Sequence, residues 1–125
     1  MKSLINIEKL SDEDEITFAD YVIYRLLDYQ VDTFFGITGG GIMYLIDSLA
    51  RNSKTKLVSV HHESFGGLAA DAYSKVSNNI GVALGTTGPG VTNLFTSLSA
   101  AWQDSSKVLF IGGQVKSADS SRINN

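Results

Sequence analysis

The chain has 125 residues, enough for a single modest domain with a hydrophobic core. Hydrophobic residues make up 43 % of it and charged residues 18 %, a composition that is typical of a folded domain and excludes a disordered tail. The net charge of −3 and the scattered lysines and arginines argue against a nucleic-acid-binding surface, and the absence of cysteine excludes disulfides and thiolate metal sites.

The first 15 residues are expected to form a polar lead-in that ends in the acidic run 11–15. They contain no long apolar segment before that run, so they do not resemble a signal peptide. No stretch of the chain approaches the ~20 apolar residues that a membrane span requires. Together with the lack of cysteine, these features predict a cytoplasmic protein that does not enter a membrane.

Helical periodicity begins directly after the lead-in. Thr17 is a candidate N-cap, and Asp20 three residues later can complete a capping-box-like pair. The apolar residues that follow share one helical face, and they are Ala19, Val22, Ile23, Leu26 and Leu27. Further helices are expected at about 42–51, 64–77 and 91–103. The residues of the last helix that we expect to face inward are Leu94, Leu98, Ala101 and Trp102, and we expect Trp102 and Phe110 to be core or interface residues.

Four short apolar segments alternate with these helices. They predict buried strands at residues 33–37, 57–60, 80–85 and 107–111. Short strands that alternate with helices require a parallel sheet, so we expect an α/β fold with an open parallel sheet and helices on both faces. Each crossover should be right-handed. Residues 115–125 are polar and lack periodicity.

In such a sheet, the four junctions that follow the strands lie at one edge. The junctions are residues 38–41, 61–64, 86–90 and 112–114. Three of them are glycine-rich, and the fourth carries an acid, Glu63, where a buried strand gives way to a helix. Open α/β folds bind ligands at this edge, and the N–H groups of a helix N-terminus favour an anion there.

Several familiar motifs fail on inspection. Residues 88–93 lack the third glycine of the dinucleotide fingerprint, and residues 85–92 lack the lysine of a P-loop. His62 and Glu63 open like a zincin helix, but Gly66 stands where the second histidine should be. No Gly-x-Ser-x-Gly elbow occurs. What remains is a carboxylate between two glycine turns, which could share a proton with a basic ring nitrogen in a dry site.

Five motifs in unbroken order resemble the N-terminal pyrimidine-binding domain of thiamine diphosphate enzymes. The closest type is the acetolactate synthase and 2-oxo-acid decarboxylase group, and the resemblance covers about residues 16–118. The motifs are Thr38-Gly39-Gly40, His62-Glu63, residues 69–73, residues 87–93 and residues 104–114.

The resemblance implies that the chain binds thiamine diphosphate, whose Mg²⁺ would be held by a second domain, with no metal ligand in this chain. Glu63 would be the catalytic acid, which hydrogen-bonds N1′ of the aminopyrimidine and thereby activates the cofactor. The other residues near the ring would be Ile37, Thr38, Gly39, Pro89 and Asn93, the last two across a subunit interface. On the substrate side would lie His62 and Gln114.

The same resemblance implies a reaction and an assembly. The enzyme would decarboxylate a 2-oxo acid, with pyruvate as the expected substrate, and transfer the two-carbon unit to an acceptor. It would be a homodimer or homotetramer that shares its site between subunits, through helix faces that begin at Ser64 and Val91. Thr38 and Lys107 stand where many relatives have proline, and the run 38–41 resembles a branch associated with surface-sugar pathways, so a keto-sugar is an alternative acceptor.

The Gly-Asp-Gly…Asn motif, with which the family holds diphosphate and magnesium, does not occur here. We therefore expect residues 16–125 to be a pyrimidine-binding domain that is truncated at its C-terminal end and inactive alone. The alternatives are a non-catalytic or relic module of the same fold, a nucleotide-binding α/β domain, or a structural protein.

Each candidate residue also has a purely structural interpretation. Glu63 could serve only the helix dipole, a contribution of about 0.3–1 kcal/mol. His61 and His62 could be filler at the end of a strand, and for His61 we prefer that interpretation. Pro89 could simply begin a helix, where its missing N–H group costs nothing. The glycine runs could be plain turns.

Overall fold

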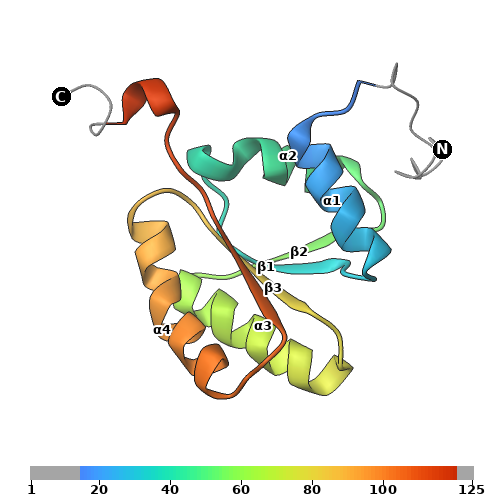
Figure 1. The fold of residues 1–125 in the computed structure, drawn as a ribbon, viewed down its shortest axis with the longest axis vertical. Helices are drawn as coiled ribbons and strands as arrows, with labels where there is room; N and C mark the ends of the chain where they lie inside the picture. The colour runs from blue at the N-terminus through green and yellow to red at the C-terminus, as the bar shows by residue number, and fades with distance from the viewer. Residues whose placement is uncertain (1–14, 121–125) are drawn as a thin grey trace.

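The structure is a computed structural model that describes residues 15–120, so the expectations for residues 1–14 and 121–125 lie outside the described part. Its four strands form one parallel sheet in the order β2-β1-β3-β4 (Figure 1). The strands are β1 (Thr33–Gly36), β2 (Lys56–Ser59), β3 (Gly81–Gly85) and β4 (Val108–Gly112). The predicted open parallel sheet is therefore confirmed.

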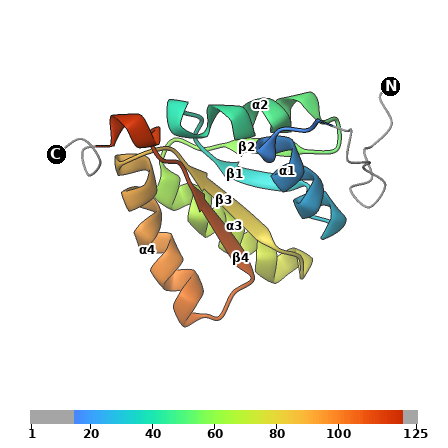
Figure 2. The ribbon, with the colours of Figure 1, turned by 45° about the horizontal axis from the view of Figure 1, so that its top comes forward.

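Helices cover both faces of this sheet, as Figures 1 and 2 show, with α1 and α2 on one face and α3 and α4 on the other. The helices are α1 (Phe18–Asp28), α2 (Met43–Arg51), α3 (Glu63–Ser77) and α4 (Pro89–Gln103). Two 3₁₀ turns, η2 (Gly40–Ile42) and η3 (Ser117–Asp119), complete the described elements. The second of these lies in a segment for which the sequence predicts no periodic structure.

The helix N-termini follow local capping chemistry. The predicted cap of α1 is confirmed, because the Thr17 hydroxyl accepts from the Asp20 amide at 3.1 Å. α3 begins at Glu63, one residue earlier than predicted, because the His62 ring nitrogen accepts from the Ser64 amide at 3.2 Å. α4 begins at Pro89, two residues earlier than predicted, in a position that needs no N–H group.

The alternation of side chains along the strands divides the core into two clusters. Phe34 packs on the α1/α2 face, whereas its neighbour Phe35 packs on the α3/α4 face. The buried members of the first cluster are Ile23, Val31, Phe34, Ile42, Leu49, Val82 and Leu84. The buried members of the second are Phe35, Ala70, Ala83 and Leu94. The second cluster is built from smaller residues, so its helices lie closer to the backbone they cover.

One part of the predicted core is wrong. Leu94 and Ala101 of α4 are buried as expected, but Leu98 is 37 % exposed and Trp102 is 83 % exposed. The inner position between the two buried residues belongs to Ser97, whose hydroxyl donates to the Leu94 carbonyl at 2.9 Å. Only a small side chain fits there, because the helix opposite approaches closely. Leu98 and Trp102 therefore lie on the outer side of this helix.

Candidate functional site

Three of the four junctions that follow the strands pack directly on one another. The Gly41 amide donates to the Thr86 hydroxyl at 3.2 Å, and a Cβ added to Gly39 would lie 2.5 Å from the same hydroxyl oxygen. A Cβ added to Gly113 would lie 2.6 Å from the Gly41 carbonyl oxygen. These glycines are required by close approach, so the loops after β1, β3 and β4 form one tightly packed edge.

The fourth junction brings Glu63 to this edge. Its side chain begins α3, and the residue is only 8 % exposed. The Asn93 side-chain amide donates to Oε2 of Glu63 at 3.0 Å. Oε1 lies beside Gly90, where an added Cβ would be 3.3 Å from it. The carboxylate is thus enclosed between the N-termini of α3 and α4, and the edge of the sheet holds one shielded acid.

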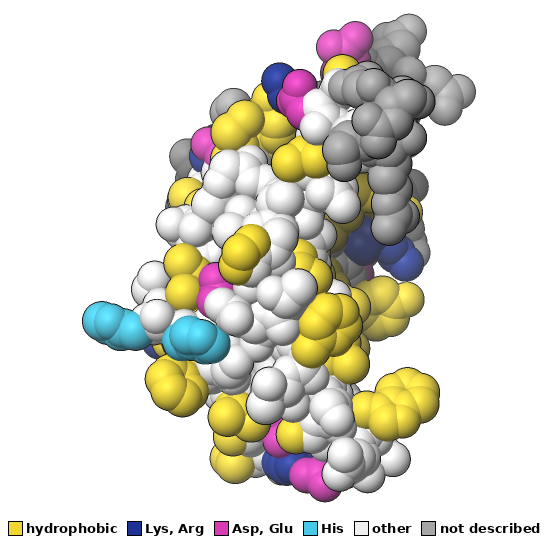
Figure 3. Space-filling view, turned by 90° about the vertical axis from the view of Figure 1, so that its left-hand side faces the viewer, with side chains coloured by type: hydrophobic (Ala, Val, Ile, Leu, Met, Phe, Trp, Pro, Cys, Tyr) yellow, Lys and Arg dark blue, Asp and Glu magenta, His cyan; other side chains and the backbone are white. Residues whose placement is uncertain are grey.

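The two histidines lie on the surface next to this acid. His61 and His62 are both exposed, and Figure 3 shows them projecting side by side. His62 has two partners within the chain: its Nδ1 atom accepts from the Ser64 amide and caps α3, and its ring is tilted by 58° against the Phe65 ring at a centroid distance of 5.8 Å. A role on the substrate side would require a ligand to reach the other ring nitrogen of His62, so this role stays a prediction.

The remaining predicted residues line the same edge at different depths. Ile37, Gly39 and Asn93 are half-buried, whereas Thr38 and Pro89 are exposed. Of these, the structure brings Asn93 into contact with Glu63. The roles that the sequence predicts for the others toward an aminopyrimidine ring stay predictions, because each concerns contacts to a ligand.

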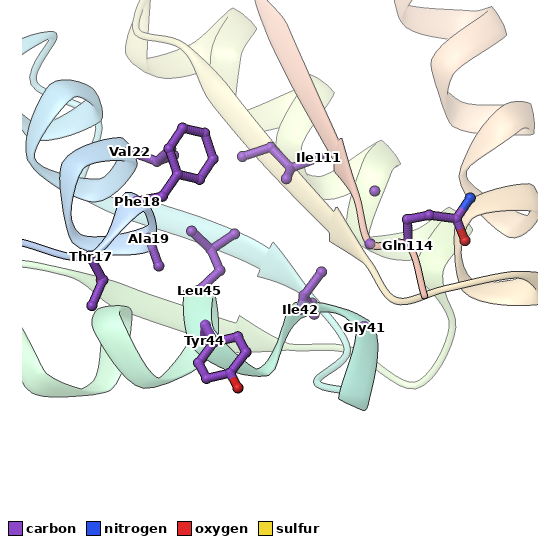
Figure 4. Close-up of a pocket in the computed structure, with 12 residues that line it drawn as sticks. Thr17, Phe18, Ala19, Val22, Gly41, Ile42, Tyr44, Leu45, Ile111 and Gln114 are labelled. Atoms are coloured by element: carbon purple, nitrogen blue, oxygen red, sulfur yellow. The ribbon is translucent and has the colours of Figure 1, made fainter. Parts of the chain in front are cut away.

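Gln114 lies toward the opposite face of the sheet. It is exposed, and its amide oxygen accepts from the Val115 N–H group at 2.9 Å. It also lines a pocket of about 520 Å³ between α1, the start of α2 and the end of β4, where Figure 4 shows it at the end away from Thr17. The pocket lining is Thr17, Phe18, Ala19, Val22, Gly41, Ile42, Tyr44, Leu45, Ile111, Gly112, Gly113 and Gln114.

Sequence reasoning missed this pocket. Phe18 and Tyr44, two of its larger side chains, lie off the predicted apolar faces of their helices and are exposed. The sequence signal that could have indicated the pocket is that these two large aromatic residues lie outside the predicted apolar faces. The lining offers aliphatic and aromatic carbon and a few polar groups, but no carboxylate or imidazole. It can hold an apolar group but offers no acid or base of the kind found at Glu63.

Two ionic clusters fasten the helices at a distance from the edge. Burial raises the pKa of Asp20, but hydrogen bonds from Ser48 and Thr17, together with the bond and charge of Arg51, outweigh it and hold the pKa below its ordinary value. Ser48 Oγ donates to the carboxylate at 2.7 Å and Arg51 donates at 2.7 Å. Because Asp20 belongs to α1 and its partners Ser48 and Arg51 to α2, this cluster joins the two helices of one layer.

The second cluster joins α3 to α4. Lys75 Nζ lies 2.8 Å from Asp71 and 2.7 Å from Asp104. The hydrogen bond from Lys75 is the main reason that the pKa of Asp71 lies below its ordinary value. Within residues 15–120, no three His, Asp or Glu side chains gather in a way that could hold a metal ion. Over the same range, no helix is both long and apolar enough to cross a bilayer.

Comparison with known proteins agrees with this geometry. A family model described as "Thiamine pyrophosphate enzyme, N-terminal TPP binding domain" matches residues 16–124. The chain belongs to this thiamine pyrophosphate enzyme family. The resemblance inferred from the five motifs is therefore confirmed, and the described fold is that of the N-terminal TPP-binding domain.

Several relatives are acetolactate synthases. The chain is 40 % identical over 113 residues to the acetolactate synthase of Mycobacterium leprae, which covers 90 % of this chain and 18 % of the relative. It is 43 % identical over 101 residues to that of Mycobacterium bovis, covering 81 % and 16 %. It is 41 % identical over 105 residues to the large subunit of Cyanidium caldarium, covering 82 % and 18 %. The chain thus spans less than a fifth of these relatives.

Proposed function

We propose that this chain is the thiamine diphosphate-binding part of a cytoplasmic, acetolactate synthase-like enzyme, in which Glu63 binds the aminopyrimidine ring. The enzyme decarboxylates a 2-oxo acid and transfers the two-carbon unit to an acceptor. One observation carries the proposal: an acid that is 8 % exposed lies at the start of α3, between two helix N-termini and next to the packed glycine loops.

The residues present suit an aminopyrimidine. Asn93 occupies one oxygen of Glu63, and the other lies beside Gly90, which has no side chain of its own. Glu63 would share a proton between this second oxygen and the ring nitrogen. Thiamine diphosphate, when bound, supplies the carbon that adds to a 2-oxo acid and accepts the electron pair released with carbon dioxide.

Other residues of the chain would surround the ring. The loops after β1 and β3 would bind its faces and edges, through Ile37, Thr38, Gly39 and Pro89. His62 and Gln114 would lie toward the substrate. The diphosphate and Mg²⁺ would be held by a second domain. Pyruvate is the proposed substrate, by likeness to the acetolactate synthases, and the acceptor is either a carbonyl acid or, as the Thr38 departure suggests, a keto-sugar.

We further propose that a second copy of the chain covers the outer faces of α3 and α4. Each helix carries an exposed apolar stripe at helical spacing, formed by Phe65, Leu68 and Val76 on α3 and by Phe95, Leu98 and Trp102 on α4. The stripe begins at Phe65, two residues after Glu63, so a partner seated on it would reach the site. A monomer in sedimentation equilibrium at all concentrations up to the millimolar range would contradict this assembly.

The decisive experiment replaces the acid in the complete enzyme. Glu63→Gln keeps the shape and the bond to Asn93 but cannot donate or accept the same proton. We expect exchange of the cofactor C2 proton with deuterated solvent to slow by about 100-fold or more, the scale of a positioned proton-transfer group. Asp104→Asn, an exposed carboxylate at the far end of α4, is the matched control and should exchange normally. Normal exchange in Glu63→Gln would refute the assigned role.

A further inference from the structure

α3 and α4 lie side by side in a constant register. Glu63 contacts Asn93 near the start of both helices. Four residues further along each helix, Gly67 faces Ser97 so closely that a Cβ on the glycine would overlap the serine hydroxyl. Since four residues are about one helical turn, the Glu63–Asn93 pair lies one turn before the tightest contact of the two helices. The relative position of acid and amide is therefore fixed by the packing of the Gly67 backbone against the Ser97 side chain.

Two hydrogen bonds in opposite directions join the helices at this point. The side chain of Asn93 donates from α4 to Oε2 of Glu63 at 3.0 Å, and Ser64 Oγ donates from α3 to the Asn93 backbone carbonyl at 2.6 Å. α3 therefore contacts Asn93 twice: Ser64 binds its backbone carbonyl, and Glu63 accepts from its side chain.

We propose that Asn93 is a positioning residue, which holds Oε2 of Glu63 and leaves Oε1 as the one carboxylate oxygen presented to the ligand beside Gly90. This inference rests on the proposed function of Glu63 and gives Asn93 a partner within the same chain. It differs from the expectation that Asn93 itself approaches the ring from across a subunit interface.

The residue type suits this task. A shielded carboxylate oxygen without a donor would be costly, and a hydrogen bond to a charged group is among the stronger ones in proteins. An amide supplies that donor without adding a charge that would compete with the ligand. Gly90 complements it, because a Cβ there would lie 2.9 Å from the Thr86 methyl group and 3.3 Å from Oε1, so a side chain at this position would crowd that oxygen.

Nuclear magnetic resonance of the full chain, without cofactor, tests the proposal directly. The first readout is the ¹³C signal of the Glu63 carboxylate, assigned by its loss in Glu63→Ala, in the wild type, Asn93→Ala and Ser64→Ala. Ser64→Ala is the matched control, because it removes the other hydrogen bond between the same two helices and leaves the amide in place. The second readout is solvent exchange of the Asn93 side-chain amide protons in wild type and in Glu63→Ala.

We expect the carboxylate signal to move in Asn93→Ala and to stay in Ser64→Ala. We also expect the Asn93 amide protons to exchange about 10- to 100-fold faster in Glu63→Ala, the range that a hydrogen bond to a charged group implies. An unmoved signal, or equal movement in both variants, would overturn the positioning role. If Asn93→Ala fails to fold, unchanged amide exchange in Glu63→Ala would overturn it instead. Because no cofactor is present, neither result depends on the outcome of the C2 exchange experiment.

Discussion

The two faces of the sheet are packed in different ways. The α1/α2 face is filled by large side chains such as Ile23, Phe34 and Leu49. The α3/α4 face is built around small ones, with Ala70 and Ala83 in its core. Large side chains can adjust their rotamers when a neighbour changes, whereas two backbones in contact cannot. The shielded acid Glu63 lies on the second face, where glycines bring the backbone of α3 close to the sheet and to α4.

Close backbone approach recurs throughout the α3/α4 face. A Cβ on Gly81 would overlap the Ala70 carbonyl, and one on Gly66 would lie 3.4 Å from the Gly36 Cα atom. These contacts set the distance of α3 from β1 and β3, and the contact between Gly67 and Ser97 sets its distance from α4. Close approach at glycines therefore sets the positions of the helices in this layer. The Glu63 carboxylate and the Asn93 amide are positioned by these helices.

Phe34→Ala should show that the α1/α2 face carries stability rather than site geometry. Phe34 is fully buried, so we expect its truncation to lower the free energy of unfolding by about 3–5 kcal/mol in a urea titration. Under native conditions, solvent exchange of the Asn93 amide should match that of the wild type. Loss of the Asn93 signal in a chain that is still folded would show that the two faces are not independent.

Gly67→Ala should have a smaller effect on stability but a direct one on the site. The added methyl group would overlap Ser97 Oγ and lie 2.5 Å from its Cβ, so the helices must move apart. Overpacking of this kind costs about 1–3 kcal/mol, which exceeds the gain of up to about 1 kcal/mol from replacing glycine in a helix. We expect the Asn93 amide to lose its slow exchange, because Asn93 and Glu63 are drawn apart.

A second change separates crowding from other causes. Ser97→Gly removes the two closest atoms that the new methyl group would meet and leaves only the Phe110 ring carbon at 3.1 Å, so the double variant Gly67→Ala with Ser97→Gly should regain the slow exchange of the Asn93 amide. Continued fast exchange in the double variant would mean that the register of α3 and α4 does not depend on this contact.

Much of this architecture could be predicted from the sequence, and the failures have a common physical origin. The strands and the α1 cap were predictable because apolar runs and Thr17 act locally. Trp102 was placed wrongly because periodicity assumes that apolar residues face inward. Here the inner position went to Ser97, since the glycine opposite leaves room only for a small side chain. Which residue of α4 lies on the inner side thus depends on a glycine 30 positions earlier in the chain, and local periodicity does not indicate this contact.

The site shows the same division. The position of Glu63 could be predicted because it follows a strand and opens a helix, which are both local features. Its bond to Asn93 could not, because it depends on the register of two helices that are joined through β3. The start of α3 was also missed by one residue, since the cap is a histidine ring nitrogen rather than one of the usual hydroxyl or carboxylamide groups.

The smallest expected effect concerns the ionic cluster at the far end of the α3/α4 face, and it is tested by pH. Lys75→Met keeps the apolar stem but removes the charge that lies between Asp71 and Asp104. The pKa of Asp71 is lower in the folded chain than its ordinary value of 3.8, chiefly because of Lys75. A carboxylate with a lowered pKa stabilises the fold fully above that ordinary value, and the contribution is lost as pH falls through the folded pKa.

The variant should therefore be less stable than the wild type at neutral pH, by less than either core substitution, because Lys75 and Asp104 are exposed to solvent. The difference in unfolding free energy should begin to shrink as pH falls below about 3.8 and should vanish once Asp71 is protonated. Asp20, which has a lowered pKa on the other face, lies outside this cluster and should contribute the same acid sensitivity to both proteins. Urea titrations of the pair at several pH values measure the difference. A gap that persists unchanged in acid would mean that the Lys75 stem, rather than its charge, holds the ends of α3 and α4 together.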